Sequence, residues 1–152
     1  MKLFVYDHNI KKKTGGESLL TEVFDLLITL NPSKTLSTTS FRDAILESLV
    51  RKGWSGPIRV SLESNITITS QKKNVGLCLQ TGNMSRFYAD LLKLQTLFSS
   101  GRISKGLFLI PTKIEAKRMD SNIANFERFV VELEIFKATI TMPISVYSFE
   151  RE

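Results

Sequence analysis

The sequence has little of what disulfides and metal–thiolate sites need. Its 152 residues contain one cysteine, Cys78, and one histidine, His8. A single cysteine excludes an internal disulfide, and without a Cys/His cluster there is no zinc site of the usual kind. Cys78 has no histidine near it in the sequence, so we expect a buried strand cysteine rather than a Cys–His nucleophile. His8 stands in a polar stretch, and we expect an exposed surface residue.

Long apolar runs are also absent. The run at residues 106–111 is far shorter than the roughly 20 residues of a membrane-spanning helix. The first residues lack the apolar segment of a secretory signal peptide. We therefore expect a cytoplasmic protein with no membrane contact.

The composition that remains is that of an ordinary globular protein with a basic surplus. Residues 1–152 are enough for one domain with a hydrophobic core. The net charge of +6 and the pI of 9.6 suit a polyanionic partner, because phosphate contacts release counterions. Charge alone fits a soluble domain without such a partner equally well.

Apolar residues recur at helical spacing in four segments, which predict four helices. The segments are residues 19–27, 41–50, 87–98 and 123–133. In the second, we expect Ser40 to cap the first turn and Gly53 to follow the last. Its expected buried stripe is Phe41, Ile45, Leu49 and Val50.

Strands are predicted at both termini and in the middle of the chain. Residues 2–6, the wholly apolar run 107–110 and residues 144–149 fit strands. Alternation over residues 66–69 and 75–80, across the polar turn 71–74, predicts an antiparallel hairpin. The order of elements predicts an α/β fold, with a mixed sheet packed between helices.

The hairpin places polar groups where some nucleases have theirs. Cys78 and Gln80 should project from one face of their strand, with Val75, Leu77 and Leu79 on the other. Nucleases of the PD-(D/E)xK kind carry an acid and a Lys or Gln at such i, i+2 positions. A further Asp lies on the preceding strand.

From about Asn65 onward the chain resembles the BglII/BstYI-type restriction endonucleases. The resemblance rests on motifs whose order and spacing match together. They are the Gln-ending strand 75–80, the loop and helix 82–98, the run 103–113, the segments 119–123 and 126–127, the close 142–146 and, upstream, residues 41–54. The resemblance implies a restriction-endonuclease-like mixed sheet flanked by helices. It also implies double-stranded DNA as partner and homodimers matched to a palindromic site.

The chain departs from the family at the metal-binding residues. By the resemblance, the strand aspartate falls on Thr69 and the glutamate on Cys78, whereas Gln80 keeps its type. A hydroxyl and a neutral thiol are poor ligands for Mg²⁺, a hard cation that prefers anionic oxygen. We therefore expect no bound metal and a degenerate catalytic site.

Acids from elsewhere could restore a metal site. Glu63 lies upstream of the hairpin, and Asp90 lies on the helix that follows it. If either has moved into the site, Mg²⁺ would be the cofactor. The alternative is that both are solvated surface acids.

DNA contacts depend less on those acids. The resemblance places two loops against a DNA groove, residues 81–83 with Thr81 and Asn83, and residues 120–122 with Ser121 and Asn122. Five basic residues are the expected phosphate partners: Lys72, Lys73, Lys113, Lys117 and Arg118. Each of them taken singly is also compatible with a solvated surface charge.

Three functions remain open. The favoured one is a catalytically degenerate restriction-endonuclease relative that binds double-stranded DNA, as a homodimer or as a subunit with another partner. The second is an active Mg²⁺-dependent endonuclease with relocated acids. In the third, the fold serves as a protein–protein interaction module. Salt-sensitive duplex affinity and metal-dependent cleavage distinguish the three.

Overall fold

The computed structural model describes residues 1–10, 15–30 and 32–152. Residues 11–14 of the basic turn before the first helix, and Asn31 at the predicted end of that helix, lie outside the described residues. Among the described residues, no helix is both long enough and apolar enough to span a membrane.

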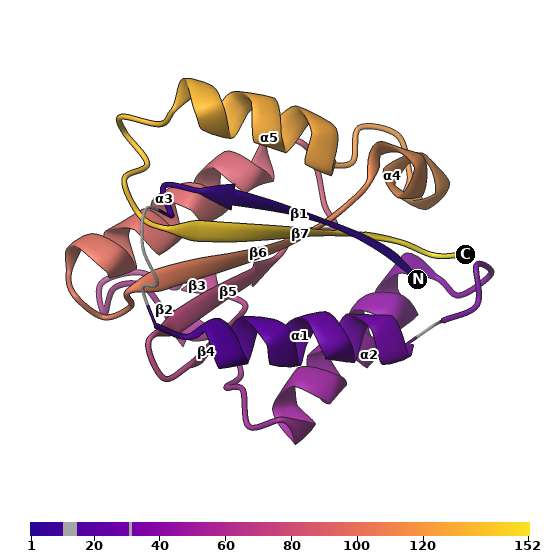
Figure 1. The fold of residues 1–152 in the computed structure, drawn as a ribbon, viewed down its shortest axis with the longest axis horizontal. Coiled ribbons are helices and arrows are strands. Elements are labelled where there is room, and N and C mark those ends of the chain that lie inside the picture. Colours follow the sequence, from indigo (N-terminus) through magenta and orange to yellow (C-terminus); the bar gives the residue numbers. More distant parts are fainter. Residues whose placement is uncertain (11–14, 31) are drawn as a thin grey trace.

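A five-stranded mixed sheet forms the centre of the fold (Figure 1). Its strand order is β1-β7-β6-β5-β4. The strands are β1 (Lys2–His8), β7 (Ile144–Glu150), β6 (Lys105–Pro111), β5 (Val75–Leu79) and β4 (Ser70–Lys72). Strands β5, β6 and β7 run parallel, and β1 and β4 pair antiparallel at the two edges. The carboxyl ends of three strands therefore meet at one end of the sheet. The predicted α/β class with a mixed sheet is confirmed.

Helices cover both faces of this sheet (Figure 1). The helices are α1 (Glu17–Leu30), α2 (Thr38–Arg51), α3 (Arg86–Ser99), α4 (Lys113–Met119) and α5 (Phe126–Ile135). Helices α1 and α2 bury one core against Leu77, Leu79 and Leu109, whereas α3 and α5 bury another against Cys78 and Phe108. The predicted alternation along β5 is thus confirmed, because successive residues enter opposite cores.

The predicted hairpin is partly wrong, because its first strand divides between two sheets. Strand β3 (Thr67–Ile68) pairs with β2 (Ile58–Arg59) in a separate two-stranded sheet, whereas β4 pairs with β5. Thr69 stands at the break. Its Oγ1 accepts a hydrogen bond from the backbone N–H of Leu79 (2.9 Å). A side chain thus replaces the missing ladder carbonyl, which keeps that N–H satisfied.

Helix α2 begins one turn earlier than predicted. Ser37, not Ser40, is the N-cap, and its Oγ accepts from the N–H of Ser40 (3.0 Å). The expected end is confirmed, since Gly53 has a φ of 83° directly after the C-cap residue. Val50 was expected in the buried stripe, but its side chain is 58% exposed. Only Phe41, Ile45 and Leu49 of that stripe are buried.

The prediction that His8 is exposed is wrong. Strand β1 extends beyond the predicted residues, and His8 pairs with Ile144 at its end. The imidazole is 1% exposed, and its Nε2 lies 2.7 Å from the carbonyl oxygen of Ile140. The backbone pairing of the strand carries this polar side chain into the protein.

Candidate functional site

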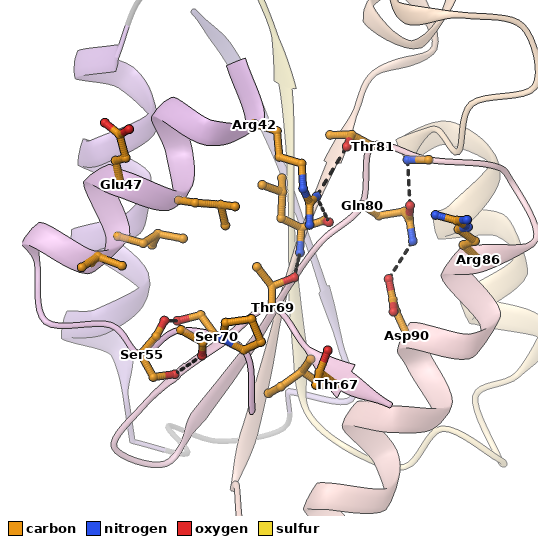
Figure 2. A pocket seen from close by; sticks show the side chains of 18 of the residues that line it. Arg42, Glu47, Ser55, Thr67, Thr69, Ser70, Gln80, Thr81, Arg86 and Asp90 are labelled. Carbon is orange, nitrogen blue, oxygen red and sulfur yellow. Dashed lines mark hydrogen bonds between the residues drawn. The ribbon is translucent and has the colours of Figure 1, made fainter. Parts of the chain in front are cut away.

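A cleft of about 1110 Å³ opens between α2 and α3, over the carboxyl end of β5 (Figure 2). Thr69, Gln80 and Thr81 form part of its floor, and Arg42 and Asp90 project from the helices on its two sides. Two residues of the predicted catalytic set, Thr69 and Gln80, therefore line one cavity. The predicted relocated acid Asp90 joins them.

Gln80, the one residue predicted to keep the family's type, is held on both sides of its amide. Its Nε2 donates to Asp90 Oδ2 (2.7 Å), and its Oε1 accepts from the N–H of Gly82 (2.8 Å). The side chain is 6% exposed. These bonds fix the turn after β5 and orient Asp90, and they leave little of the amide for a ligand.

The two predicted relocated acids lie in different places. Asp90 stands in the cleft, where its second oxygen, Oδ1, accepts from Lys93 Nζ (2.9 Å). Glu63 is exposed in the connection between β2 and β3 and does not line the cleft. Asp90 is therefore the acid that the fold brings to Gln80, already bound to two internal partners.

Neither Thr69 nor Cys78 presents an anionic oxygen. The Thr69 hydroxyl accepts the Leu79 N–H, and Cys78 is 1% exposed within the core. Burial, with a smaller contribution from Asp90, raises the pKa of the Cys78 thiol far above its ordinary value. The thiol is thus protonated near neutral pH. Among the described residues no cluster of three or more His, Cys, Asp or Glu side chains is placed to hold a metal ion. These donors do not fit Mg²⁺.

Charged side chains line the cleft, and of these only Asp90 was predicted from the sequence. Four are basic and two are acidic: Arg42, Arg51, Arg86, Lys93, Glu47 and Asp90. Arg42 shares a helical face with Leu46 and Leu49, at spacings of four and seven residues. A charge on the inward face of an amphipathic helix is the signal that could have identified it.

The two predicted groove-facing loops lie side by side. The N–H of Met84 donates to the carbonyl of Asn122 (3.0 Å), and the N–H of Ala124 donates to that of Gly82 (2.9 Å). An isolated bridge joins Asn83 to Ile123 between them. Residues 81–83 and 121–122 therefore form one surface next to the cleft. Contact of Thr81, Asn83, Ser121 and Asn122 with DNA stays a prediction.

The five predicted phosphate partners do not form one cluster. Lys72 and Lys73 lie at the β4–β5 turn, at the opposite end of β5 from Gln80. Lys72 Nζ is bound to Glu22 Oε1 (2.8 Å), whereas Lys73 is exposed. Lys113 and Lys117 are exposed on α4, a short helix that periodicity did not predict. This placement favours the α4 lysines over Lys72 as phosphate partners.

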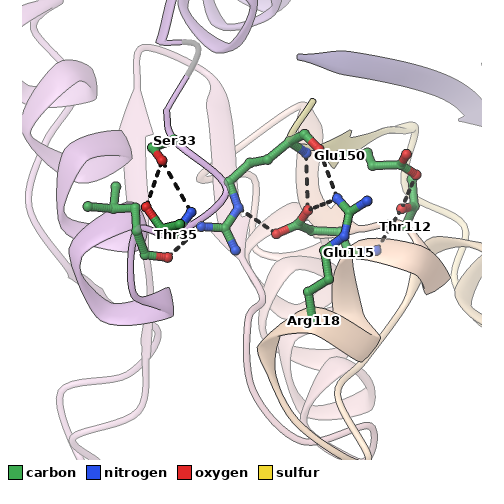
Figure 3. Close-up of polar contacts among 8 residues, drawn as sticks. Ser33, Thr35, Thr112, Glu115, Arg118 and Glu150 are labelled. Carbon is green, nitrogen blue, oxygen red and sulfur yellow. Dashed lines mark hydrogen bonds and ion pairs between the residues drawn. The ribbon is translucent and has the colours of Figure 1, made fainter.

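Arg118, also on α4, belongs to a polar network at the carboxyl ends of β6 and β7 (Figure 3). Its centre is Glu115, whose carboxylate is fully buried. Arg151 Nε donates to Glu115 Oε1 (2.6 Å), and Arg118 Nη1 donates to Oε2 (3.2 Å). Beside it, Thr112 Oγ1 donates to Glu150 Oε2 (2.8 Å). The charges here are largely bound to one another.

Comparisons with known proteins agree with this fold. The family model described as restriction endonuclease BglII/BglIII matches residues 7–148. Two of the similar solved structures are of BglII. A BglII restriction endonuclease complexed with a DNA 16-mer has a TM-score of 0.84 and 13% identity, covering 97% of this chain and 76% of that one. Free BglII has a TM-score of 0.76 and 15% identity, covering 100% and 81%. No curated protein matches. Because the family model spans most of the sequence, the chain belongs to the BglII/BglIII restriction endonuclease family.

Proposed function

We propose that this protein binds double-stranded DNA in the cleft between α2 and α3 and does not hydrolyse it with a metal centre of its own. The observation that carries the proposal is that Thr69 lines the cleft and Cys78 is buried in the core beside it, so that neither residue offers a carboxylate at the positions that the resemblance matches to the family's metal ligands. Family membership supports DNA as the partner, and the solved relative with the higher TM-score is in complex with a DNA 16-mer.

The chemistry of the donor set supports loss of metal-dependent cleavage. Mg²⁺ is usually held in such sites by one or two carboxylates together with the substrate phosphate. Here Thr69 and Gln80 are engaged in internal hydrogen bonds, and Cys78 is a protonated thiol. Asp90, the carboxylate that contacts Gln80, is bound by Gln80 and by Lys93 (2.9 Å). These residues therefore offer no ligand set for the metal ion that would help to deprotonate the attacking water.

A second function, an endonuclease with a relocated acid, is favoured by one observation. Asp90 lies 2.7 Å from the retained Gln80 with Lys93 beside it, so acid, amide and amine stand together in the cleft. In this alternative Asp90 releases one internal partner to bind Mg²⁺. Asp90→Asn would then abolish cleavage, whereas Glu63→Gln, on an exposed connection outside the cleft, would leave it unchanged.

Subunit pairing is part of the proposal. The family resemblance implies a homodimer, and a degenerate copy could instead pair with an active partner. Sedimentation of the purified chain, alone and with duplex, measures the assembly. A monomer that binds no DNA would favour the protein-interaction alternative.

The test is plasmid cleavage and duplex binding with the same preparation. Supercoiled plasmid is incubated with Mg²⁺ and then with Mn²⁺, and wild type is compared with Gln80→Ala. We expect no nicking and a duplex affinity that weakens steeply with added salt. Metal-dependent nicking that Gln80→Ala removes would contradict the proposal and favour the relocated-acid endonuclease.

A further inference from the structure

We propose that Arg42 and Arg86 form a phosphate-binding pair, which gives this cleft the positive charge that a metal ion would otherwise supply. The inference rests on the proposed function, and it names the residues that hold the DNA backbone there. It also predicts that binding is independent of divalent metal.

Charge pairing within the cleft singles out these two residues. The Glu47 carboxylate is paired with Arg51 (3.2 Å), and the Asp90 carboxylate is paired with Lys93 (2.9 Å). Each acid of the cleft lining thus has a basic partner from its own helix. Arg42 and Arg86 remain, and no carboxylate among residues 1–10, 15–30 and 32–152 lies within ion-pair distance of either.

The two guanidinium groups reach consecutive residues of the turn after β5 (Figure 2). Arg42 Nη1 donates to the carbonyl of Leu79 (2.8 Å) and lies 3.5 Å from Thr81 Oγ1. Arg86 packs over Gly82, where an added Cβ would lie 3.4 Å from its Cδ and 3.6 Å from its Nη1. Figure 2 shows them on opposite sides of Gln80. A phosphate above this turn would meet one arginine from each helix.

Anchoring makes Arg42 suited to this role. The bond to Leu79 uses one of the five N–H donors of the guanidinium and restricts its orientation. The remaining donors form the planar fork that matches a phosphate in a bidentate manner. Arg42 is half-buried, which strengthens its electrostatic attraction relative to a charge in bulk water.

The same arrangement explains why carboxylates can be absent. Two carboxylates at positions 69 and 78 would repel a phosphate unless a divalent ion offset them. Thr69, which lines the cleft, and Cys78, which is buried in the core as a protonated thiol, carry no negative charge, so the arginines attract the phosphate directly. Without the two carboxylates no metal ion is needed to offset their charge, and the arginines supply the positive charge that attracts the phosphate.

The experiment measures binding of a fluorescent duplex by anisotropy in EDTA, across a series of salt concentrations. Wild type is compared with Arg42→Gln, Arg86→Gln and the double variant. The matched control is Lys137→Gln, which removes one positive charge. Lys137 lies near Asn9, at the end of the sheet where β7 begins, and its ammonium is 3.8 Å from Glu134.

Each arginine variant should weaken binding about tenfold, because a charge-assisted bond to phosphate is lost. The slope of log affinity against log salt should fall by about 0.9 for each lost contact and by about 1.8 for the double variant. Lys137→Gln should change affinity less than about threefold, since its charge is distant and screened. Thermal unfolding checks that Arg42→Gln, which loses the bond to Leu79, is folded. The Arg86 side chain makes no hydrogen bond to another described residue, so Arg86→Gln should not disturb the fold.

The outcomes separate the inference from the function beneath it. If wild type binds duplex in EDTA and the folded arginine variants bind as Lys137→Gln does, the phosphate pair is wrong and the proposed function stands. If wild type binds no duplex with or without metal, both are wrong. Weakened binding and a reduced salt slope confined to the arginine variants support the pair.

Discussion

Arginines lie at both halves of the sheet's carboxyl end, but among the described residues they are paired with a carboxylate at one half and unpaired at the other. At the end of β6 and β7, Arg151 and Arg118 are bound to the fully buried Glu115. At the end of β5, Arg42 and Arg86 face a cleft without a carboxylate partner among the described residues. A paired buried arginine holds the fold together, whereas an unpaired one beside a cavity is available to a ligand. The partner thus determines what an arginine does.

Removing the buried carboxylate of the paired arginines should have the largest effect on stability. Glu115→Ala leaves the guanidinium of Arg151, which is 3% exposed, without its carboxylate. Removing one member of a buried ion pair costs about 3–5 kcal/mol. Urea unfolding measures the loss. The matched control Glu47→Ala removes an exposed ion pair with Arg51 and should cost less than about 1 kcal/mol. Equal losses would show that burial does not distinguish the two pairs.

An intermediate effect is expected at the floor of the cleft. Thr69→Val keeps the side-chain shape but removes the acceptor of the Leu79 N–H, whose bond is 2.9 Å long. An unpaired N–H there should cost about 1–2 kcal/mol. Thr67→Val, two residues earlier, removes a hydroxyl for which no hydrogen bond is found among the described residues. It should be nearly neutral. If Thr69→Val is as stable as wild type, Thr69 does not hold the strand end.

The fold was more predictable from the sequence than the site. Strands β5 and β6 could be predicted because burial leaves a pattern in their sequences. Side chains that enter different cores alternate at Val75–Gln80, and the run at Leu107–Ile110 is wholly apolar. Helix α4 was missed because its seven residues are too few to show a periodicity. His8 was misplaced because strand pairing, and not its polarity, decides its burial.

At the site, the family resemblance predicted Thr69 and Gln80 as site residues, and the structure places both in one cleft. Arg42 was missed because its role depends on whether a carboxylate lies beside it in the folded protein. Pairing of Asp90 with Lys93 could be read from their i, i+3 spacing, but the absence of a partner for Arg42 needs the folded chain. Residue types can be read from sequence, whereas charge balance in a cavity cannot.

A smaller effect, on the pH dependence of stability, tests whether the buried Cys78 thiol is protonated in the native protein. Burial raises the pKa of Cys78 above its ordinary 9.0, so above that pH the unfolded chain loses a proton that the native protein keeps. Stability from this group is therefore complete below pH 9.0 and falls as the pH rises, by at most about 1.4 kcal/mol per pH unit.

Urea unfolding of wild type and Cys78→Ala at pH values on both sides of 9.0 measures that loss. Wild type should lose more stability on the alkaline side than Cys78→Ala does. Tyr147, whose pKa burial raises to about 12 with help from Asp7, is common to both proteins, and its effect cancels. Parallel pH profiles would show that the thiol already ionises in the native protein.

Duplex affinity with and without Mg²⁺ tests the central claim most directly. A fluorescent duplex is titrated with wild-type protein in EDTA and then in Mg²⁺ at matched ionic strength. A site whose cations are arginines should bind equally well, or more weakly because Mg²⁺ competes for phosphates, and the duplex should stay intact. Binding that tightens about tenfold or more with Mg²⁺, with cleavage that Asp90→Asn abolishes, would contradict the account and show a working metal site.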